Sequence, residues 1–204
     1  ALLFFYRKLL GRDIAAGDAI VRAKKPVRVP VVLSRDEVKD ILMRLQGEKQ
    51  LVGKLLYGTG MRLMECLSLR VQDIDFKRNE ITIRNGKGSK DRRTMLPAAL
   101  KTELRMHLET VKAIHQKDLA DGWGRVQIPE ALSRKFINAP TDWNWQWVFP
   151  QERRWIDPTS GAQSRHHMDP SIIQRAVHSA VVEAGITKSA SCHTFRHSFA
   201  THLL

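Results

Sequence analysis

The stretch "EITIRNGKGSKDRRTML", residues 80–96, decides the fold class of this 204-residue chain. Residues 80–84 alternate apolar and polar side chains, a turn with two glycines follows, and residues 92–96 return as a second extended run. This pattern predicts an antiparallel β-hairpin. Because helical patterns precede and follow the hairpin, we expect an α+β fold that is mostly helical, with a small antiparallel sheet.

Helix signals lie on both sides of the hairpin. Ser34 followed by Glu37 forms a capping box and predicts a helix over "SRDEVKDILMRL". Apolar spacing and end signals predict five more helices, which are "KQLVGKLLYG", "MRLMECLSLR" after the turn at 58–60, a long amphipathic helix containing Leu100, Leu104, Leu108 and Val111, a helix from Asp169-Pro170 to Gly185, and "HTFRHSFATHLL" at 193–204.

On the last of these helices, spacing separates polar from apolar side chains. His193 and Arg196 are three residues apart and share a face, whereas Phe195, Phe199 and Leu203 lie on another. We therefore expect a helix that is buried on its apolar face and offers an imidazole and a guanidinium side by side.

The charge balance favours an acidic partner. The chain has 34 Lys and Arg against 21 Asp and Glu, a net charge of +13. Such an excess usually neutralises a polyanion, most often nucleic acid, although it can also serve solubility alone. The two cysteines form no disulfide framework, so a reducing cytosol is expected. The longest apolar runs are too short for a membrane span, and no membrane is expected as a partner.

Two cations stand where an anion could bind. Arg62 follows a Gly-Thr-Gly turn at a helix start, where free backbone N–H groups favour an anion; the alternative is a surface arginine paired with Glu65. Lys87 is flanked by two glycines, which let a backbone approach a phosphate closely; the alternative is a basic, solvated turn. The turn lacks the glycine and hydroxyl positions of a Walker A loop.

The histidines allow two chemistries. His193 and His197 have the spacing of zinc-protease ligands, but Thr194 occupies the position of the general-base glutamate, which disfavours a zinc protease. His166 and His167 could also suggest a metal, but adjacent histidines in a basic stretch more often lie at the surface or contact DNA. Two arginines, a lysine and a histidine without clustered carboxylates describe a site for a phosphate that gains negative charge without a metal.

Three segments, in this order, resemble the boxes of the tyrosine recombinase (phage integrase) family: "TGMRLMECLSLRVQDID", "GKGSKDRR" and "HTFRHSFATHLL". Three more are similar to an insertion of integron integrases: "GWGRVQIPEALSRKF", "WNWQWVFP" and "RHHM". The resemblance implies a catalytic domain of the DNA breaking–rejoining type. It also implies site-specific recombination that inserts and excises gene cassettes through a 3′-phosphotyrosine intermediate.

The resemblance also implies roles for individual residues. Arg62 and Arg196 would clamp the scissile phosphate, and His193 would hydrogen-bond it and assist proton transfer. Lys87 would be the general acid for the leaving 5′-hydroxyl, and Glu65 would support Arg62. The family conserves bond energy in the phosphotyrosine, so no cofactor, neither ATP nor a metal, is expected.

Contacts to DNA are expected outside this catalytic set. Trp143, Trp145 and Trp147 alternate and would share one face in extended backbone, where a ring could stack on an unpaired base or simply anchor the insertion. We expect most of the tryptophans to pack and Trp145 to reach DNA. The full set expected at DNA is Lys24, Lys25, Arg28, Lys90, Arg92, Arg93, Trp145, His166 and His167.

The resemblance divides the chain into parts. Residues 1–22 would be the last helix of a truncated N-terminal core-binding (SAM-like) domain, 23–33 a basic linker, and 34–204 the catalytic domain, with an insertion at about 115–150. The family's tyrosine nucleophile follows the H-x-x-R box, and neither Tyr6 nor Tyr57 holds that position. We therefore expect these residues to lack the nucleophile and to be inactive by themselves.

The expected partners follow from the same resemblance. They are a folded single-stranded cassette hairpin and a double-stranded attachment site, bound by a tetramer of the full-length protein in the bacterial cytoplasm, at the nucleoid. Two other classes stay open from the residues alone. One is a non-catalytic DNA-binding relic of an integrase, and the other is a zinc hydrolase.

Overall fold

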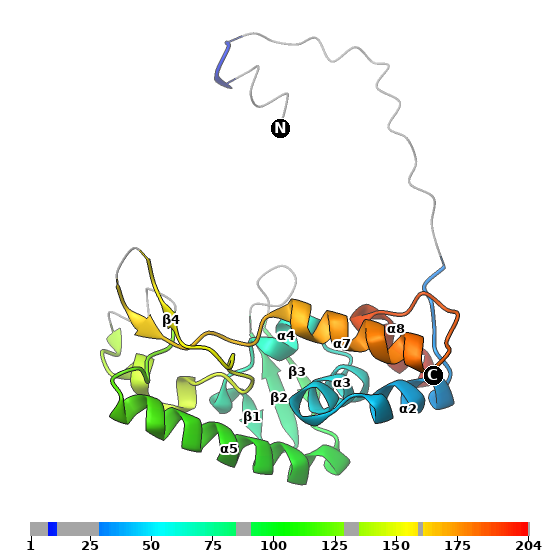
Figure 1. The fold of residues 1–204 in the computed structure, drawn as a ribbon, viewed down its shortest axis with the longest axis horizontal. Coiled ribbons are helices and arrows are strands. Elements are labelled where there is room, and N and C mark those ends of the chain that lie inside the picture. Colours follow the sequence, from blue (N-terminus) through cyan, green and yellow to red (C-terminus); the bar gives the residue numbers. More distant parts are fainter. Residues whose placement is uncertain (1–7, 12–28, 85–90, 129–134, 159–160, 204) are drawn as a thin grey trace.

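The computed structural model describes residues 8–11, 29–84, 91–128, 135–158 and 161–203. A three-stranded antiparallel sheet lies at its centre, with one long helix, α5, along its lower edge and α2, α3, α7 and α8 gathered beside it (Figure 1). The α+β prediction is therefore confirmed. Among the described residues, no helix is both long and apolar enough to cross a membrane.

The first two helices form as their end signals predict. α2 spans Arg35–Arg44, and its N-cap Ser34 shares a capping box with Glu37: Ser34 Oγ accepts the Glu37 N–H at 3.2 Å and Glu37 Oε2 accepts the Ser34 N–H at 2.6 Å. α3 spans Gly47–Thr59 and buries much of its surface. These two helices pack against α7, which spans Pro170–Glu183.

The turn after α3 depends on a glycine. Gly60 has φ +63°, the left-handed region, and a Cβ there would lie 2.5 Å from Phe199 Cδ1. Phe199 belongs to α8, Cys192–His202, which packs along α3. The close approach of α8 to this turn is therefore possible only because residue 60 has no side chain.

The next helix is shorter than its sequence predicts. A helix over 61–70 is expected, but α4 spans only Leu63–Leu67, and Arg62 is its N-cap in extended backbone (φ −76°, ψ 155°). The chain leaves the helix because the backbone on either side of residue 70 pairs with residues 146–148, which lie in the segment 115–150 that we call the insertion. The Val148 N–H donates to Leu69 O and the Val71 N–H donates to Gln146 O. The turn η1, Val71–Asp73, follows.

The predicted hairpin is present within one residue at each end. β2 (Glu80–Ile83) pairs antiparallel with β3 (Arg92–Met95), and β2 also pairs with β1 (Ile74–Asp75). Two residues are too few to show a strand period, so β1 could not be predicted. Ile81 and Ile83 point into the core, at 0% and 1% exposure.

Two further helices complete the core. The turn η2 (Ala98–Leu100) leads into α5 (Lys101–Ala120), which buries Leu104, Leu108 and Val111 as predicted. α7 begins at Pro170 with N-cap Asp169, whose side chain accepts the Ser171 N–H. On α8 the apolar face is only partly covered, because Phe195 is 1% exposed whereas Leu203 is 65% exposed.

The region between α5 and α7 is irregular. It contains η3 (Ala139–Thr141), η4 (Trp143–Trp145) and a two-stranded ribbon of β4 (Trp155–Ile156) and β5 (Gln163–Ser164). The extended backbone in which the three tryptophans would share one face is not formed at 143–145, because η4 is a 3₁₀ turn whose N-cap Asp142 accepts the Asn144 N–H. The Trp143 ring lies beside His115, whereas Trp145 and Trp147 line one groove.

Candidate functional site

Arg62 and Glu65 are joined at the start of α4. The Arg62 N–H donates to Glu65 Oε2 at 2.9 Å, and its Nη1 donates to Glu65 Oε1 at 2.6 Å. The Glu65 side chain is 9% exposed, whereas that of Arg62 is 35% exposed. The pairing that spacing allows is therefore present, and it leaves part of the guanidinium open at the surface.

The same carboxylate binds an arginine from the sheet. Arg92, the first residue of β3, donates from Nη2 to Glu65 Oε2 at 2.7 Å. Burial of the Glu65 carboxyl works to raise its pKa, but hydrogen bonds from Arg62 and Arg92 outweigh burial and hold the pKa below its ordinary value. Glu65 is therefore ionised at neutral pH and compensates part of the charge around it.

Arg196 brings a third guanidinium from α8. Its Nη1 donates to the carbonyl oxygen of Gly60, the residue whose lack of a side chain lets α8 approach the turn. Burial lowers the pKa of Arg196, and the charges of Arg62 and Arg92 lower it further, against the attraction of Glu65. Arg62 and Arg92 meet at Glu65, and Arg196 binds the backbone two residues before Arg62, so we call Arg62, Arg92 and Arg196 the arginine cluster.

His193 lies on the same helix, one turn before Arg196. It is exposed, and its ring makes an edge-on contact with His197 at 5.3 Å between centroids. Thr194, between them, is buried and its Oγ1 accepts the Ser191 N–H at 3.0 Å, which closes the start of α8. Thr194 therefore caps the helix at the position where a zinc protease has its general base.

The arginine cluster has the charge and the donors to bind an anion. Its three guanidinium groups face one carboxylate, which binds two of them directly, so the cluster keeps a net positive charge. Guanidinium forks match the oxygens of a phosphate in pairs, and fixed donors of this kind can stabilise charge that develops during a reaction. Among the described residues, no group of three His, Cys, Asp or Glu side chains gathers that could hold a metal ion.

Five of the other predicted contacts fall outside the described residues: Lys24, Lys25, Arg28, Lys87 and Lys90. Successive residues of a strand point to opposite faces, so Arg93 turns away from its neighbour in the cluster and pairs with Glu80 at 3.6 Å.

The predicted aromatic contacts form a second group. The His166 and His167 rings lie 4.2 Å apart between centroids, and both pack against Trp147, at 5.8 Å and 5.2 Å. Burial lowers the pKa of His166, with further lowering from His167 and Arg70. The histidines therefore contact the buried Trp147, not the half-buried Trp145.

A groove of about 360 Å³ lies between α4 and the insertion. Glu65, whose carboxylate binds two arginines of the cluster, lines it together with Trp145 and Trp147. The carboxylate that holds Arg62 and the predicted stacking ring therefore line the same groove.

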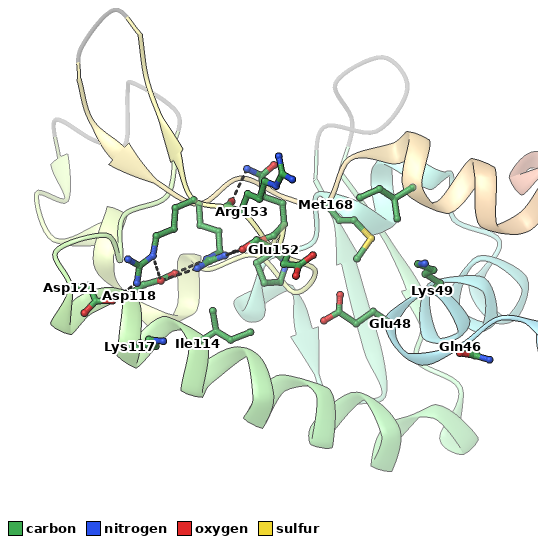
Figure 2. Close-up of a pocket in the computed structure, with 15 residues that line it drawn as sticks. Gln46, Glu48, Lys49, Ile114, Lys117, Asp118, Asp121, Glu152, Arg153 and Met168 are labelled. Carbon is green, nitrogen blue, oxygen red and sulfur yellow. Dashed lines mark hydrogen bonds and ion pairs between the residues drawn. The ribbon is translucent and has the colours of Figure 1, made fainter.

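A larger groove, of about 980 Å³, lies away from these residues, between α5, the insertion and α3. Figure 2 shows Asp118 on one side of it, with Glu48 and Lys49 on the other. Asp118 is 2% exposed and accepts from Arg154 at 2.9 Å and from Arg165 at 2.6 Å and 2.8 Å. Burial acts to raise the Asp118 pKa, but these hydrogen bonds and charges hold it below its ordinary value.

Sequence reasoning does not predict the contacts that Arg92, Asp118 and Arg70 make in these sites. It assigns Arg92 only to DNA, and nothing in the spacing of 65 and 92 indicates their contact. Asp118 and its arginines are equally far apart in the chain. Arg70 carries a usable signal, because Arg70 and Asp73 have the spacing of a helix start and the Arg70 N–H does donate to Asp73 Oδ2 at 2.9 Å.

Solved structures define the class of fold. The crystal structure of XerA recombinase superposes with a TM-score of 0.57 at 24% identity, covering 99% of this chain and 58% of that chain. XerH site-specific recombinase bound to its difH substrate, in a pre-cleavage complex, gives 0.53 at 22% identity, over 88% of this chain and 44% of that chain. The fold is therefore that of tyrosine recombinase catalytic domains.

The family follows from the sequence comparison. Residues 31–204 match the phage integrase family, and the chain belongs to it. It is 51% identical over 204 residues to an integrase/recombinase of Escherichia coli, covering all of this chain and 60% of the relative. Tyrosine recombinase XerA of Pyrococcus furiosus is 29% identical over 89% of this chain and 50% of its own length. The chain thus spans 60% of the Escherichia coli relative.

Proposed function

We propose that this chain is the catalytic part of a site-specific recombinase that cuts and rejoins DNA through a 3′-phosphotyrosine bond. The observation that carries the proposal is the arginine cluster, which brings together α4, β3 and α8 around one half-buried carboxylate, that of Glu65. Its members include both arginines that the family resemblance assigns to the scissile phosphate. An intact cluster also disfavours a relic that has lost catalysis.

In this proposal each side chain acts on the phosphate directly or through a neighbour. Arg62 and Arg196 bind the non-bridging oxygens, so negative charge that builds up during attack is compensated by fixed donors. Glu65 holds Arg62 in place and limits repulsion within the cluster. His193 hydrogen-bonds the phosphate, and Lys87 protonates the leaving 5′-hydroxyl.

We also propose that neither tyrosine of the chain is the nucleophile. Tyr57 lies on α3 and its hydroxyl is hydrogen-bonded to His202 Nδ1 at 2.8 Å, in a half-buried position. A nucleophile must reach in-line attack distance from the phosphorus atom. Tyr6 lies outside the described residues. The family resemblance instead assigns the attacking phenol to a tyrosine that follows the H-x-x-R box.

The finer proposal concerns the substrate. The insertion motifs resemble those of integron integrases, and Trp145, half-buried and lining a groove, supports contact with an unpaired base of a cassette hairpin. The DNA-bound XerH structure supports DNA as the partner of this fold. The protein would insert and excise gene cassettes, acting as a tetramer on DNA.

A chimera tests the proposed reaction. Residues 31–204 replace the matching segment of the Escherichia coli relative, which supplies the remaining chain. We expect the chimera to recombine a cassette hairpin with a duplex site, without ATP and in the presence of EDTA. Loss of activity on chelation, restored by zinc or magnesium, would contradict the proposed chemistry, and recombination of two duplex sites only would contradict the cassette substrate.

A further inference from the structure

Arg70 is a buried cation that holds two distant parts of the insertion. It is 8% exposed; its Nη1 donates to Trp145 O at 2.8 Å and its Nη2 donates to Gln127 O at 2.7 Å. Burial lowers its pKa to about 9, against the attraction of Asp73, so it stays charged at neutral pH. A planar fork can serve both carbonyls at once, which a single ammonium group does poorly.

The backbone of the same residue joins the insertion as well. Arg70 forms an isolated β-bridge with Trp147, flanked by backbone hydrogen bonds on both sides. Its guanidinium carbon lies 3.0 Å from the centroid of the Trp147 ring. Trp147 in turn packs against His166 and His167. Arg70 therefore contacts the backbone of Trp145 and the ring that supports the histidine pair.

Arg70 also lies between the two walls of the groove beside the arginine cluster. Met64, Glu65 and Ser68 line one wall, and Trp145 and Trp147 line the other. Arg70 comes from the core segment that follows α4, yet its guanidinium hydrogen bonds end on the insertion. The Arg70 side chain, together with the backbone pairing on either side of residue 70, consequently ties one wall to the other.

We propose that Arg70 is a positioning residue that fixes the spacing between the arginine cluster and Trp145, and thereby selects DNA with an unpaired base at a matching distance from the cleaved phosphate. The selection part rests on the proposed function. Arg70 itself need not touch DNA, because it acts through the carbonyl of Trp145 and the ring of Trp147.

The first test measures selectivity in the 204-residue chain. Two hairpins of equal length are compared, one with a single unpaired base and one fully paired, in wild type, R70K and R70Q. Base–aromatic stacking predicts a preference of about fivefold or more for the unpaired base in wild type. We expect both variants to lose this preference while their affinity for the paired hairpin stays within about twofold, since paired binding depends mainly on overall charge.

R84K is the matched control. Arg84 lines the same groove, but its guanidinium pairs with Asp73 of the core at 2.6 Å instead of with a carbonyl of the insertion. It should keep the wild-type preference. A wild-type preference that R70K keeps, or an equal loss of that preference in R70K and R84K, would overturn the proposal.

The second test does not depend on DNA. The five tryptophans are replaced by 5-fluorotryptophan, and each ¹⁹F signal is assigned by Trp→Phe substitution. R70K or R70Q should shift the Trp145 and Trp147 signals and leave that of Trp155 unchanged. An unshifted Trp145 signal in both folded variants overturns the positioning role. A wild type without hairpin preference instead contradicts the proposed substrate, and the ¹⁹F signals then decide the role of Arg70.

Discussion

At the scale of single residues, Glu65 organises the site because its half-buried carboxylate binds two arginines of the cluster. Its folded pKa is lowered, so its contribution to stability is present above the unfolded pKa and is lost as pH falls through the folded value. The chain should therefore lose stability below about pH 4.5, the ordinary value for this group.

The substitution E65Q tests this role. A neutral amide at this position would leave three guanidinium groups without a compensating carboxylate, so we expect the free energy of unfolding to drop by about 1.5–3 kcal/mol at pH 7. Because a protonated glutamate resembles glutamine, the difference between wild type and E65Q should shrink as the pH falls below about 4.5. Urea unfolding of wild type and E65Q between about pH 7 and pH 3 measures the drop in unfolding free energy and its pH dependence. A drop that stays constant with pH would contradict the account.

Residue-level prediction from sequence succeeds where the signal is local. Arg62 with Glu65 and Ser34 with Glu37 are three residues apart, and both contacts are present. The contacts of Arg92 with Glu65 and of Arg196 with Gly60 join distant segments, so no periodicity could reveal them. The roles of Arg62, Lys87, His193 and Arg196 stay predictions that rest on the family resemblance.

At the scale of elements, the approach of α8 to the end of α3 positions Arg196. We expect G60A to destabilise the chain by about 1–3 kcal/mol or more, because alanine is strained at φ +63° and its Cβ would meet Phe199. G185A is the matched control: Gly185 has φ +66°, but nothing lies within 4 Å of an added Cβ. Thermal unfolding should show a larger loss for G60A, and equal losses would show that α8 does not press on this turn.

The Asp118 pairs fasten the β4–β5 ribbon to α5. We expect D118N to destabilise the chain by about 3 kcal/mol, because it leaves Arg154 and Arg165 without their buried carboxylate. D121N removes the other, 43% exposed partner of Arg154 and should cost less than about 1 kcal/mol. Hydrogen exchange should show faster opening of β4 and β5, residues 155–156 and 163–164, in D118N alone. Similar exchange in both variants would mean that the ribbon is held by other contacts.

Element prediction fails where tertiary contacts override local pattern. The 61–70 segment has helical spacing, yet pairing of Leu69 and Val71 with the insertion limits α4 to five residues. The tryptophan alternation suggests extended backbone, but Asp142 closes a 3₁₀ turn there. Helices such as α2, α5 and α7 are predicted well because residues close in the sequence carry the signal. The capping residues mark the starts of α2 and α7, and the apolar spacing marks the buried face of α5.

At the scale of the whole molecule, the net charge of +13 predicts salt-sensitive binding to DNA. Each neutralised phosphate of duplex DNA contributes about −0.9 to the slope of log K against log salt concentration. We expect a slope of about −4 or steeper for the whole chain, measured by fluorescence anisotropy on a duplex. A slope near zero between low and moderate salt would contradict a DNA-facing basic surface.

The central claim is that the arginine cluster holds the scissile phosphate, and the cleavage rate of the chimera on a neutralised phosphate tests it most directly. On natural DNA, R196A should cleave about 10²–10³-fold more slowly, the usual loss for one charge-stabilising donor. A methylphosphonate at the scissile position removes the negative charge that Arg196 would stabilise, so the defect of R196A should fall below about tenfold there. R78A, on an exposed arginine paired with Asp75, should match wild type on both substrates. An R196A defect of the same size on phosphate and methylphosphonate would contradict the claim.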